Sequence, residues 1–219
     1  MYLVMLGGPG AGKGTASDDL AKKYNIPHVS TGDMLREEVA KGSELGLEVK
    51  QIMAEGKLVS DDLVKRLVEN KLQSEECING IILDGYPRNS EQAKTLDEIF
   101  ESIGKKLDAT IEIDVPDEVI IDRISNRVLC SNKACGAIYN FKNVKPQVEG
   151  KCDKCGADLY QRSDDNAESV KKRLEIYHEE VAGIVEYYKQ KGILHTLHST
   201  AETQPADTLK KIVDILDNL

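Results

Sequence analysis

The chain has 219 residues, of which 31% are charged and 40% hydrophobic, and its formal net charge is −9. This composition excludes a disordered chain and fits a globular protein with one core and room for insertions. The acidic balance and the lack of a long basic run argue against nucleic acid as the main partner.

Membrane and export signals are not apparent in the sequence. No stretch approaches the roughly 18 consecutive apolar residues of a membrane span. Residues 1–6 look like a first strand rather than a secretion signal. We therefore expect a cytoplasmic monomer without a membrane partner. In a reducing compartment, clustered cysteines more often bind metal than form disulfides.

Strands and helices are predicted to alternate along the chain. The predicted strands are residues 1–6, 28–30, 80–84, 109–115 and 193–198. The predicted helices are residues 13–24, 34–41, 47–56, 90–104, 119–127, 167–190 and 206–219, and a further helix starts at the N-cap signal of residues 60–62 and carries residues 63–68. This order indicates an α/β protein with a doubly wound, parallel sheet of about five strands and ligands at the strands' carboxyl ends. Residues 30–59 and 127–163 interrupt the alternation and are candidate substrate-binding inserts.

A glycine-rich loop follows the first predicted strand. Residues 7–15 read Gly-Gly-Pro-Gly-Ala-Gly-Lys-Gly-Thr. In a strand–loop–helix context, such glycines let backbone N–H groups surround a phosphate, and Lys13 would reach the outer phosphates of a nucleoside triphosphate. A plain turn would not need the Lys-Gly-Thr ending, and a dinucleotide fingerprint fails because Lys13 occupies its third glycine position. Gly14 stands where this loop normally has Ser or Thr.

An acid and an arginine follow the predicted strand at residues 80–84. Asp84 is placed to act on magnesium directly or through its waters, and the alternative is an aspartate that caps a helix. Arg88 lies on the next loop, where a guanidinium can bind phosphate in a bidentate manner, and the alternative is a solvated surface arginine. Further arginines bracket the two inserts, as needed to close on two polyphosphates: Arg36, Arg123, Arg127, Arg162 and Arg173.

Four cysteines occur as two pairs, Cys130-x4-Cys135 and Cys152-x2-Cys155, and a glycine follows each pair. Zinc favours four thiolates in closed structural sites, so the pairs predict a structural zinc site rather than a catalytic one. Residues 127–162 carry seven Lys and Arg against three Asp and Glu. This cationic segment would suit covering an anionic nucleotide. Cys77 stands alone and is predicted to be a buried apolar residue, and no histidine is given a role.

These motifs together resemble the adenylate kinase family, in its form with a long zinc-binding lid, over the whole chain. The resemblance is carried by residues 7–15, 30–36, 56–59, 84–88 with Gln92, 122–127 and 161–165. Glycine at the Gly14 position is usual in that family. Val128 departs from the pattern, since an arginine often stands there, and the first cysteine pair is two residues wider than usual.

The resemblance implies reversible, Mg²⁺-dependent phosphoryl transfer from ATP to AMP, giving two ADP. It implies ATP contacts from Gly10, Ala11, Gly12, Lys13, Gly14, Thr15, Arg123, Arg127, Ile138, Tyr139 and Gln204. It implies AMP contacts from Thr31, Arg36, Lys57, Leu58, Val59, Gly85, Tyr86, Pro87, Arg88, Gln92, Arg162 and Arg173. The implied catalytic residues are Lys13, Arg88, Arg123, Arg127, Arg162 and Arg173, with Asp84 on magnesium through water and Cys130, Cys135, Cys152 and Cys155 on zinc.

The implied organisation is a phosphate-loop core of residues 1–29, 60–126 and 164–219, a helical AMP-binding insert of residues 30–59 and a small, β-rich zinc lid of residues 127–163. The nearest alternative is another nucleoside monophosphate kinase, with UMP, CMP or GMP as acceptor. A GTPase is disfavoured because no Asn-Lys-x-Asp motif is present. A zinc ribbon that binds nucleic acid is disfavoured by the net charge and the 5% aromatic content.

Overall fold

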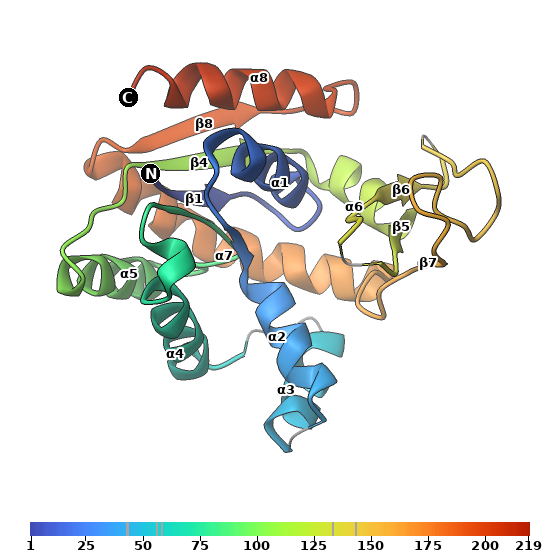
Figure 1. Ribbon diagram of the computed structural model, residues 1–219, viewed down its shortest axis with the longest axis horizontal. Coiled ribbons are helices and arrows are strands. Elements are labelled where there is room, and N and C mark those ends of the chain that lie inside the picture. The colour runs from blue at the N-terminus through green and yellow to red at the C-terminus, as the bar shows by residue number, and fades with distance from the viewer. Residues whose placement is uncertain (43, 56, 58, 133, 143) are drawn as a thin grey trace.

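A five-stranded parallel sheet forms the centre of the molecule in the computed structural model (Figure 1), which describes residues 1–42, 44–55, 57, 59–132, 134–142 and 144–219. Its strands are β1 (Tyr2–Leu6), β2 (His28–Ser30), β3 (Ile81–Asp84), β4 (Ala109–Asp114) and β8 (Leu194–His198), in the order β2-β3-β1-β4-β8. All neighbouring strands are parallel. The predicted α/β fold with a parallel five-stranded sheet is confirmed.

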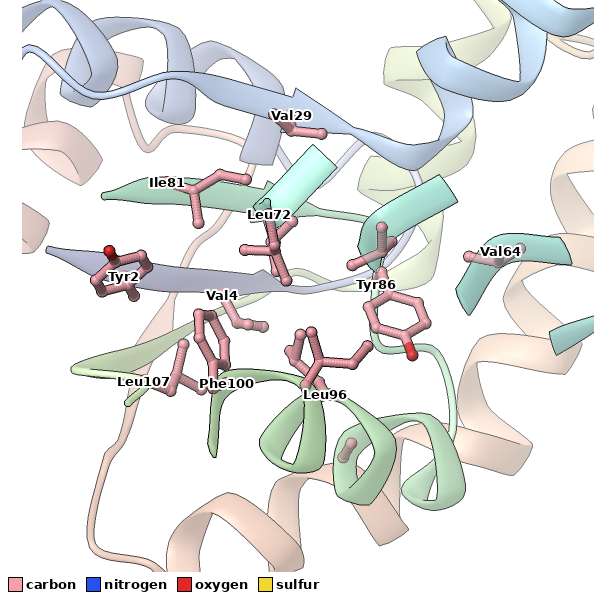
Figure 2. Close-up of a cluster of buried hydrophobic side chains, with 14 of the residues drawn as sticks. Tyr2, Val4, Val29, Val64, Leu72, Ile81, Tyr86, Leu96, Phe100 and Leu107 are labelled. Atoms are coloured by element: carbon pink, nitrogen blue, oxygen red, sulfur yellow. The ribbon is translucent and has the colours of Figure 1, made fainter. Parts of the chain in front are cut away.

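Helices cover both faces of this sheet. One apolar cluster joins alternate β1 residues, such as Val4, to α4 (Asp61–Leu72), α5 (Ser90–Ser102) and α7 (Ala167–Gln190) (Figure 2). The second joins the intervening β1 residues, Leu3 and Met5, to α1 (Lys13–Tyr24), α6 (Asp117–Ser125) and α8 (Pro205–Leu216). Successive side chains of a strand point to opposite faces, so β1 supplies both clusters. The sheet is therefore buried on both sides.

Two segments depart from the central layers. Helices α2 (Thr31–Ala40) and α3 (Glu44–Ala54) lie below the sheet in Figure 1. Strands β5 (Arg127–Cys130), β6 (Ile138–Asn140) and β7 (Leu159–Tyr160) form a separate antiparallel sheet, drawn at the right. A short 3₁₀ helix, η1 (Glu75–Cys77), precedes β3. None of the helices in the described segments has the length and apolar character needed to cross a bilayer.

The predicted elements are present, and their ends shift by a few residues. Helix α2 begins at Thr31 rather than Met34, because the Ser30 hydroxyl accepts a hydrogen bond from the Asp33 N–H (3.3 Å) and caps an earlier first turn. Helix α6 ends at Ser125 rather than Arg127, because Arg127 is already the first residue of β5.

Candidate active site

The glycine-rich loop joins the carboxyl end of β1 to the amino end of α1. Gly12 is the N-cap of α1 and has φ of 104°, a conformation that favours glycine. Gly7 has φ of 140°, and a Cβ there would lie 2.5 Å from the carbonyl oxygen of Ile113. The loop therefore needs glycine for its shape, and it leaves the free N–H groups of a helix start available to an anion.

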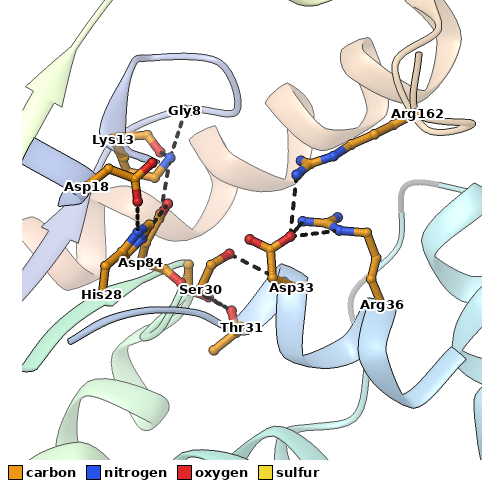
Figure 3. Close-up of polar contacts among 12 residues, drawn as sticks. Gly8, Lys13, Asp18, His28, Ser30, Thr31, Asp33, Arg36, Asp84 and Arg162 are labelled. Atoms are coloured by element: carbon orange, nitrogen blue, oxygen red, sulfur yellow. Dashed lines mark hydrogen bonds and ion pairs between the residues drawn. The ribbon is translucent and has the colours of Figure 1, made fainter. Parts of the chain in front are cut away.

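Lys13, the first residue of α1, folds back over this loop. Its Nζ donates to the carbonyl oxygens of Gly7 (2.8 Å) and Gly8 (2.9 Å) and lies 3.9 Å from Oδ1 of Asp84 (Figure 3). Burial lowers the pKa of Lys13, Asp84 opposes that effect, and Arg173, Arg88 and Arg127 add to it through their positive charge. Three positive charges and one carboxylate therefore act on Lys13.

Asp84 ends β3 directly beside the glycine-rich loop, because Met5 of β1 is its partner across the sheet. Burial opposes ionisation of Asp84, but Lys13 and His28 hold its pKa below the usual range. His28 Nδ1 lies 2.8 Å from Oδ1 of Asp18, and its Nε2 lies 3.8 Å from Oδ2 of Asp84 (Figure 3). Burial would lower the pKa of His28, yet the two carboxylates raise it to about 9. Asp84 is thus an ionised carboxylate of the kind that suits Mg²⁺ and its water shell.

Five of the six predicted arginines form one group with Lys13. Burial lowers the pKa of Arg173 to about 10, although Asp164 opposes it, and the charges of Arg127 and Arg88 lower it further. Arg162 likewise has its pKa lowered by burial and by the charges of Arg36 and Arg127. The structure therefore brings the following side chains into one cationic cluster: Lys13, Arg36, Arg88, Arg127, Arg162 and Arg173. Such a cluster favours an anionic ligand with several charges.

Carboxylates hold several of these arginines in place. Asp165, whose side chain is fully buried, accepts two hydrogen bonds from Arg127, at 2.9 Å from Nε and 2.5 Å from Nη2. Asp164 lies 3.4 Å from Nη1 of Arg173. The Asp33 carboxylate joins α2 to the segment after β7, because it accepts from both Arg36 and Arg162 (Figure 3).

The remaining residues expected to contact ATP are Arg123, Ile138, Tyr139 and Gln204. Arg123 donates to the Thr200 carbonyl oxygen (3.1 Å), on the loop that ends at Gln204, the N-cap of α8. Ile138 of β6 is exposed, whereas the Tyr139 ring is buried within the segment of β5–β7. The Tyr139 side chain therefore points away from solvent.

Four of the residues expected to contact AMP, namely Thr31, Val59, Arg88 and Gln92, line a small hollow between α2 and the Gly85–Arg88 loop. Its lining residues are Thr31, Leu35, Val59, Val64, Arg88 and Gln92. Thr31 Oγ1 and Arg88 Nε both donate to the Gly85 carbonyl oxygen, each at 2.8 Å, so they hold the loop against α2. Tyr86 belongs to the hydrophobic core (Figure 2), Pro87 is buried, and Lys57 pairs with Glu55. Leu58 lies outside the described residues.

Comparison with known proteins addresses the family directly. Residues 5–193 match the family model described as adenylate kinase. The chain belongs to the adenylate kinase family. It is 47% identical over 216 residues to the adenylate kinase of Caldicellulosiruptor bescii and 48% identical over 216 residues to that of Thermosipho africanus, with 99% of each chain covered. The adenylate kinase of Archaeoglobus fulgidus is 45% identical over 219 residues, covering 100% of this chain and 99% of its own.

As a member of the adenylate kinase family, the chain is a nucleoside monophosphate kinase. The predicted resemblance is confirmed. The roles of individual residues stay predictions, and the geometry above shows which of them share one site.

The four cysteines predicted to bind zinc come together in this adenylate kinase family member. Their Sγ atoms all lie within 4.8 Å of one another, with Cys130 and Cys155 at 3.4 Å and Cys135 and Cys152 at 3.7 Å. Zinc–sulfur bonds of about 2.3 Å in a tetrahedron place sulfurs roughly 3.8 Å apart, so the donor set fits zinc. Tyr139 Oη lies 3.5 Å from Cys152 Sγ and accepts from the Asp153 N–H, which leaves its own proton for the sulfur.

Sequence reasoning gave no role to three site residues, namely His28, Asp164 and Asp165. The acidic pair stands two residues after Arg162, and His28 begins a strand whose carboxyl end faces the site. These positions, next to a predicted site arginine and on a strand that ends at the site, are the signals in the sequence that point to the three residues. What the sequence lacked was the pairing of Asp165 with Arg127, 38 residues away.

Proposed function

We propose that this protein transfers the γ-phosphoryl group of ATP to AMP, reversibly and with Mg²⁺, to give two ADP. One observation carries the proposal: six cationic side chains meet between the glycine-rich loop and the hollow beside Arg88. A site for two polyphosphates needs that much positive charge at the point where their phosphates face each other.

In this proposal the loop N–H groups bind the ATP phosphates, and Lys13 turns from the loop carbonyls to the outer phosphates. The hollow holds AMP, with its phosphate on Arg36 and Arg88. The acceptor phosphate is already anionic, so no general base is needed, and catalysis consists of alignment and neutralisation of charge. Mg²⁺, held through water by Asp84, would neutralise charge on the ATP phosphates.

We further propose the division into a core (residues 1–29, 60–126 and 164–219), an AMP-binding insert (30–59) and a zinc lid (127–163). Closure of the two inserts would exclude water, so that transfer is faster than hydrolysis of ATP. A structural zinc on Cys130, Cys135, Cys152 and Cys155 would hold the lid's fold. The expectation of a cytoplasmic monomer without nucleic acid or membrane partners stays a prediction.

A coupled assay for ADP tests the activity, with ATP and Mg²⁺ against AMP, UMP, CMP and GMP in turn. We expect rapid ADP formation when AMP is the acceptor and not when UMP, CMP or GMP is. Equal use of UMP, CMP or GMP would contradict the proposed acceptor and favour another nucleoside monophosphate kinase.

The role of Lys13 is tested in the same assay with two lysine variants of α1. Lys13→Ala removes the only charge within the phosphate loop, and we expect turnover to fall about 10²–10³-fold with the fold retained. Lys22→Ala, at an exposed position of the same helix, is the matched control and should keep full activity. Retained turnover in Lys13→Ala would contradict the proposed role.

A further inference from the structure

The hollow beside Arg88 has apolar walls and a single carboxamide. Leu35, Val59 and Val64 line it, and Gln92, 3% exposed, borders it from the first turn of α5. The free space is about 10 Å³, so a flat heterocyclic base would enter only as α2 moves away, and the apolar walls and the amide would then suit a base that is read by a pair of hydrogen bonds. The orientation of the Gln92 amide therefore decides which base the hollow accepts.

Two neighbours fix that orientation. The Arg88 N–H donates to Gln92 Oε1 (2.7 Å), and Gln92 Nε2 donates to Oδ1 of Asp61 (2.6 Å). A backbone amide can only donate and an ionised carboxylate can only accept, so the oxygen must face Arg88 and the nitrogen must face Asp61. This leaves the amide with one N–H and one oxygen lone pair for a ligand.

Asp61 is itself held in place at the first position of α4. Its second oxygen accepts from Asn89 Nδ2 (3.2 Å), and Asn89 Oδ1 in turn accepts from the Gln92 N–H (2.8 Å) as the N-cap of α5. Asp61, Asn89 and Gln92 thus form a closed ring of hydrogen bonds that joins the starts of two helices. Rotation of the Gln92 amide would place its oxygen against the Asp61 carboxylate.

We propose that Asp61 is a positioning residue for base selectivity, which holds the Gln92 amide in the orientation that suits adenine and rejects 6-oxopurines; this rests on the proposed function. Adenine offers an acceptor at N1 and a donor at N6, which one N–H and one lone pair match. Hypoxanthine and guanine offer a donor at N1 and an acceptor at O6, so their order is reversed. A rotated amide would suit them, but Asp61 and the Arg88 N–H both oppose that rotation.

Asp61→Asn tests the proposal, because an asparagine can either accept from the Gln92 nitrogen or donate to its oxygen. The measured quantity is the ratio of kcat/KM for AMP to kcat/KM for inosine monophosphate, which reverses the donor and acceptor order without adding a 2-amino group. We expect this ratio to fall about tenfold, the order of one charge-assisted hydrogen bond, with the KM for ATP unchanged. The ratio does not depend on the folded fraction, so a merely structural effect would leave it constant.

Asp62→Asn is the matched control, since it removes the same charge from the next residue of the same exposed helix start. It should keep the wild-type ratio. An unchanged ratio in Asp61→Asn, or an equal fall in Asp62→Asn, would overturn the inference while AMP phosphorylation by the wild type still supports the proposed function. A wild type that does not phosphorylate AMP would instead overturn the proposed function, and this inference with it.

Discussion

The central sheet and the lid segment, residues 127–163, bury very different amounts of apolar surface. Both faces of the sheet carry large apolar clusters in which residues such as Leu83 and Ile111 are completely buried. The described cluster of the lid consists of Val128, Cys130, Ala137, Tyr139 and Cys152. A segment of fewer than about 40 residues cannot bury enough surface to fold on that basis and usually needs a metal or disulfides. The difference indicates that apolar burial stabilises the core, and we expect metal ligation by the cysteines to stabilise the lid.

The largest expected effect on the core comes from Leu83→Ala. Leu83 is 0% exposed and pairs with Val4 and Val29 across the sheet, so its truncation leaves a cavity at the centre. We expect a loss of about 3–4 kcal/mol in the free energy of unfolding, measured by urea titration. Val148→Ala, at an exposed lid position, should change that free energy by less than about 0.5 kcal/mol. Equal effects of the two variants would remove the contrast between core and lid.

A smaller effect on the core is expected from pH, through His28. Its pKa of about 9 in the folded protein lies above its ordinary value of 6.5, so the folded state favours the protonated form. The resulting stabilisation is complete below pH 6.5 and is lost as the pH rises through 9, and it amounts to roughly 3 kcal/mol. Unfolding of the magnesium-free protein at pH 6 and pH 9.5 measures it. His28→Gln should remove most of the difference, and an unchanged difference in this variant would exclude His28 as its source.

The smallest effect on the core is expected from Cys152→Ala, which removes one of the four clustered thiols. Bound zinc should be lost and the lid should melt at a lower temperature, while activity falls modestly and the core's unfolding free energy changes by less than about 1 kcal/mol. Cys77→Ala is the opposite control, because Cys77 is buried in the core and lies outside the cluster. It should keep the metal and lower the stability of the core. Unchanged zinc content and melting in Cys152→Ala would show that the cysteines do not hold a structural metal.

Much of the core could be predicted from the sequence because its signals are local. The run Ile81-Ile82-Leu83 ending in Asp84 is typical of a buried parallel strand, and the structure confirms it. The order of the strands has no local signal, since β1 lies between β3 and β4 only through pairing over long sequence separations. The early start of α2 depends on one capping hydroxyl, Ser30, whose geometry a pattern of apolar residues does not contain.

The sequence predicts those parts of the candidate site whose residues belong to a local motif. The glycine-rich loop, Arg88 and the cysteine pairs each carry their chemistry in their spacing. The spacing of a motif does not indicate the partners of its residues. Asp61 lies 31 residues from Gln92 in the sequence, and only folding brings the two together. The same holds for the carboxylates that accompany the arginines, because an aspartate beside an arginine in space has no fixed offset in sequence.

Those carboxylate–arginine pairs have a consequence for the energetics of nucleotide binding. Asp165 already binds the Arg127 side chain, and Asp33 binds Arg36 and Arg162, so these guanidinium groups are oriented before a nucleotide binds. Freezing a long side chain on association typically costs about 0.5–1.5 kcal/mol of conformational entropy. A polyphosphate that docks on preorganised guanidinium groups avoids much of this loss, so the affinity of the site depends on the aspartates as well as on the cations they hold.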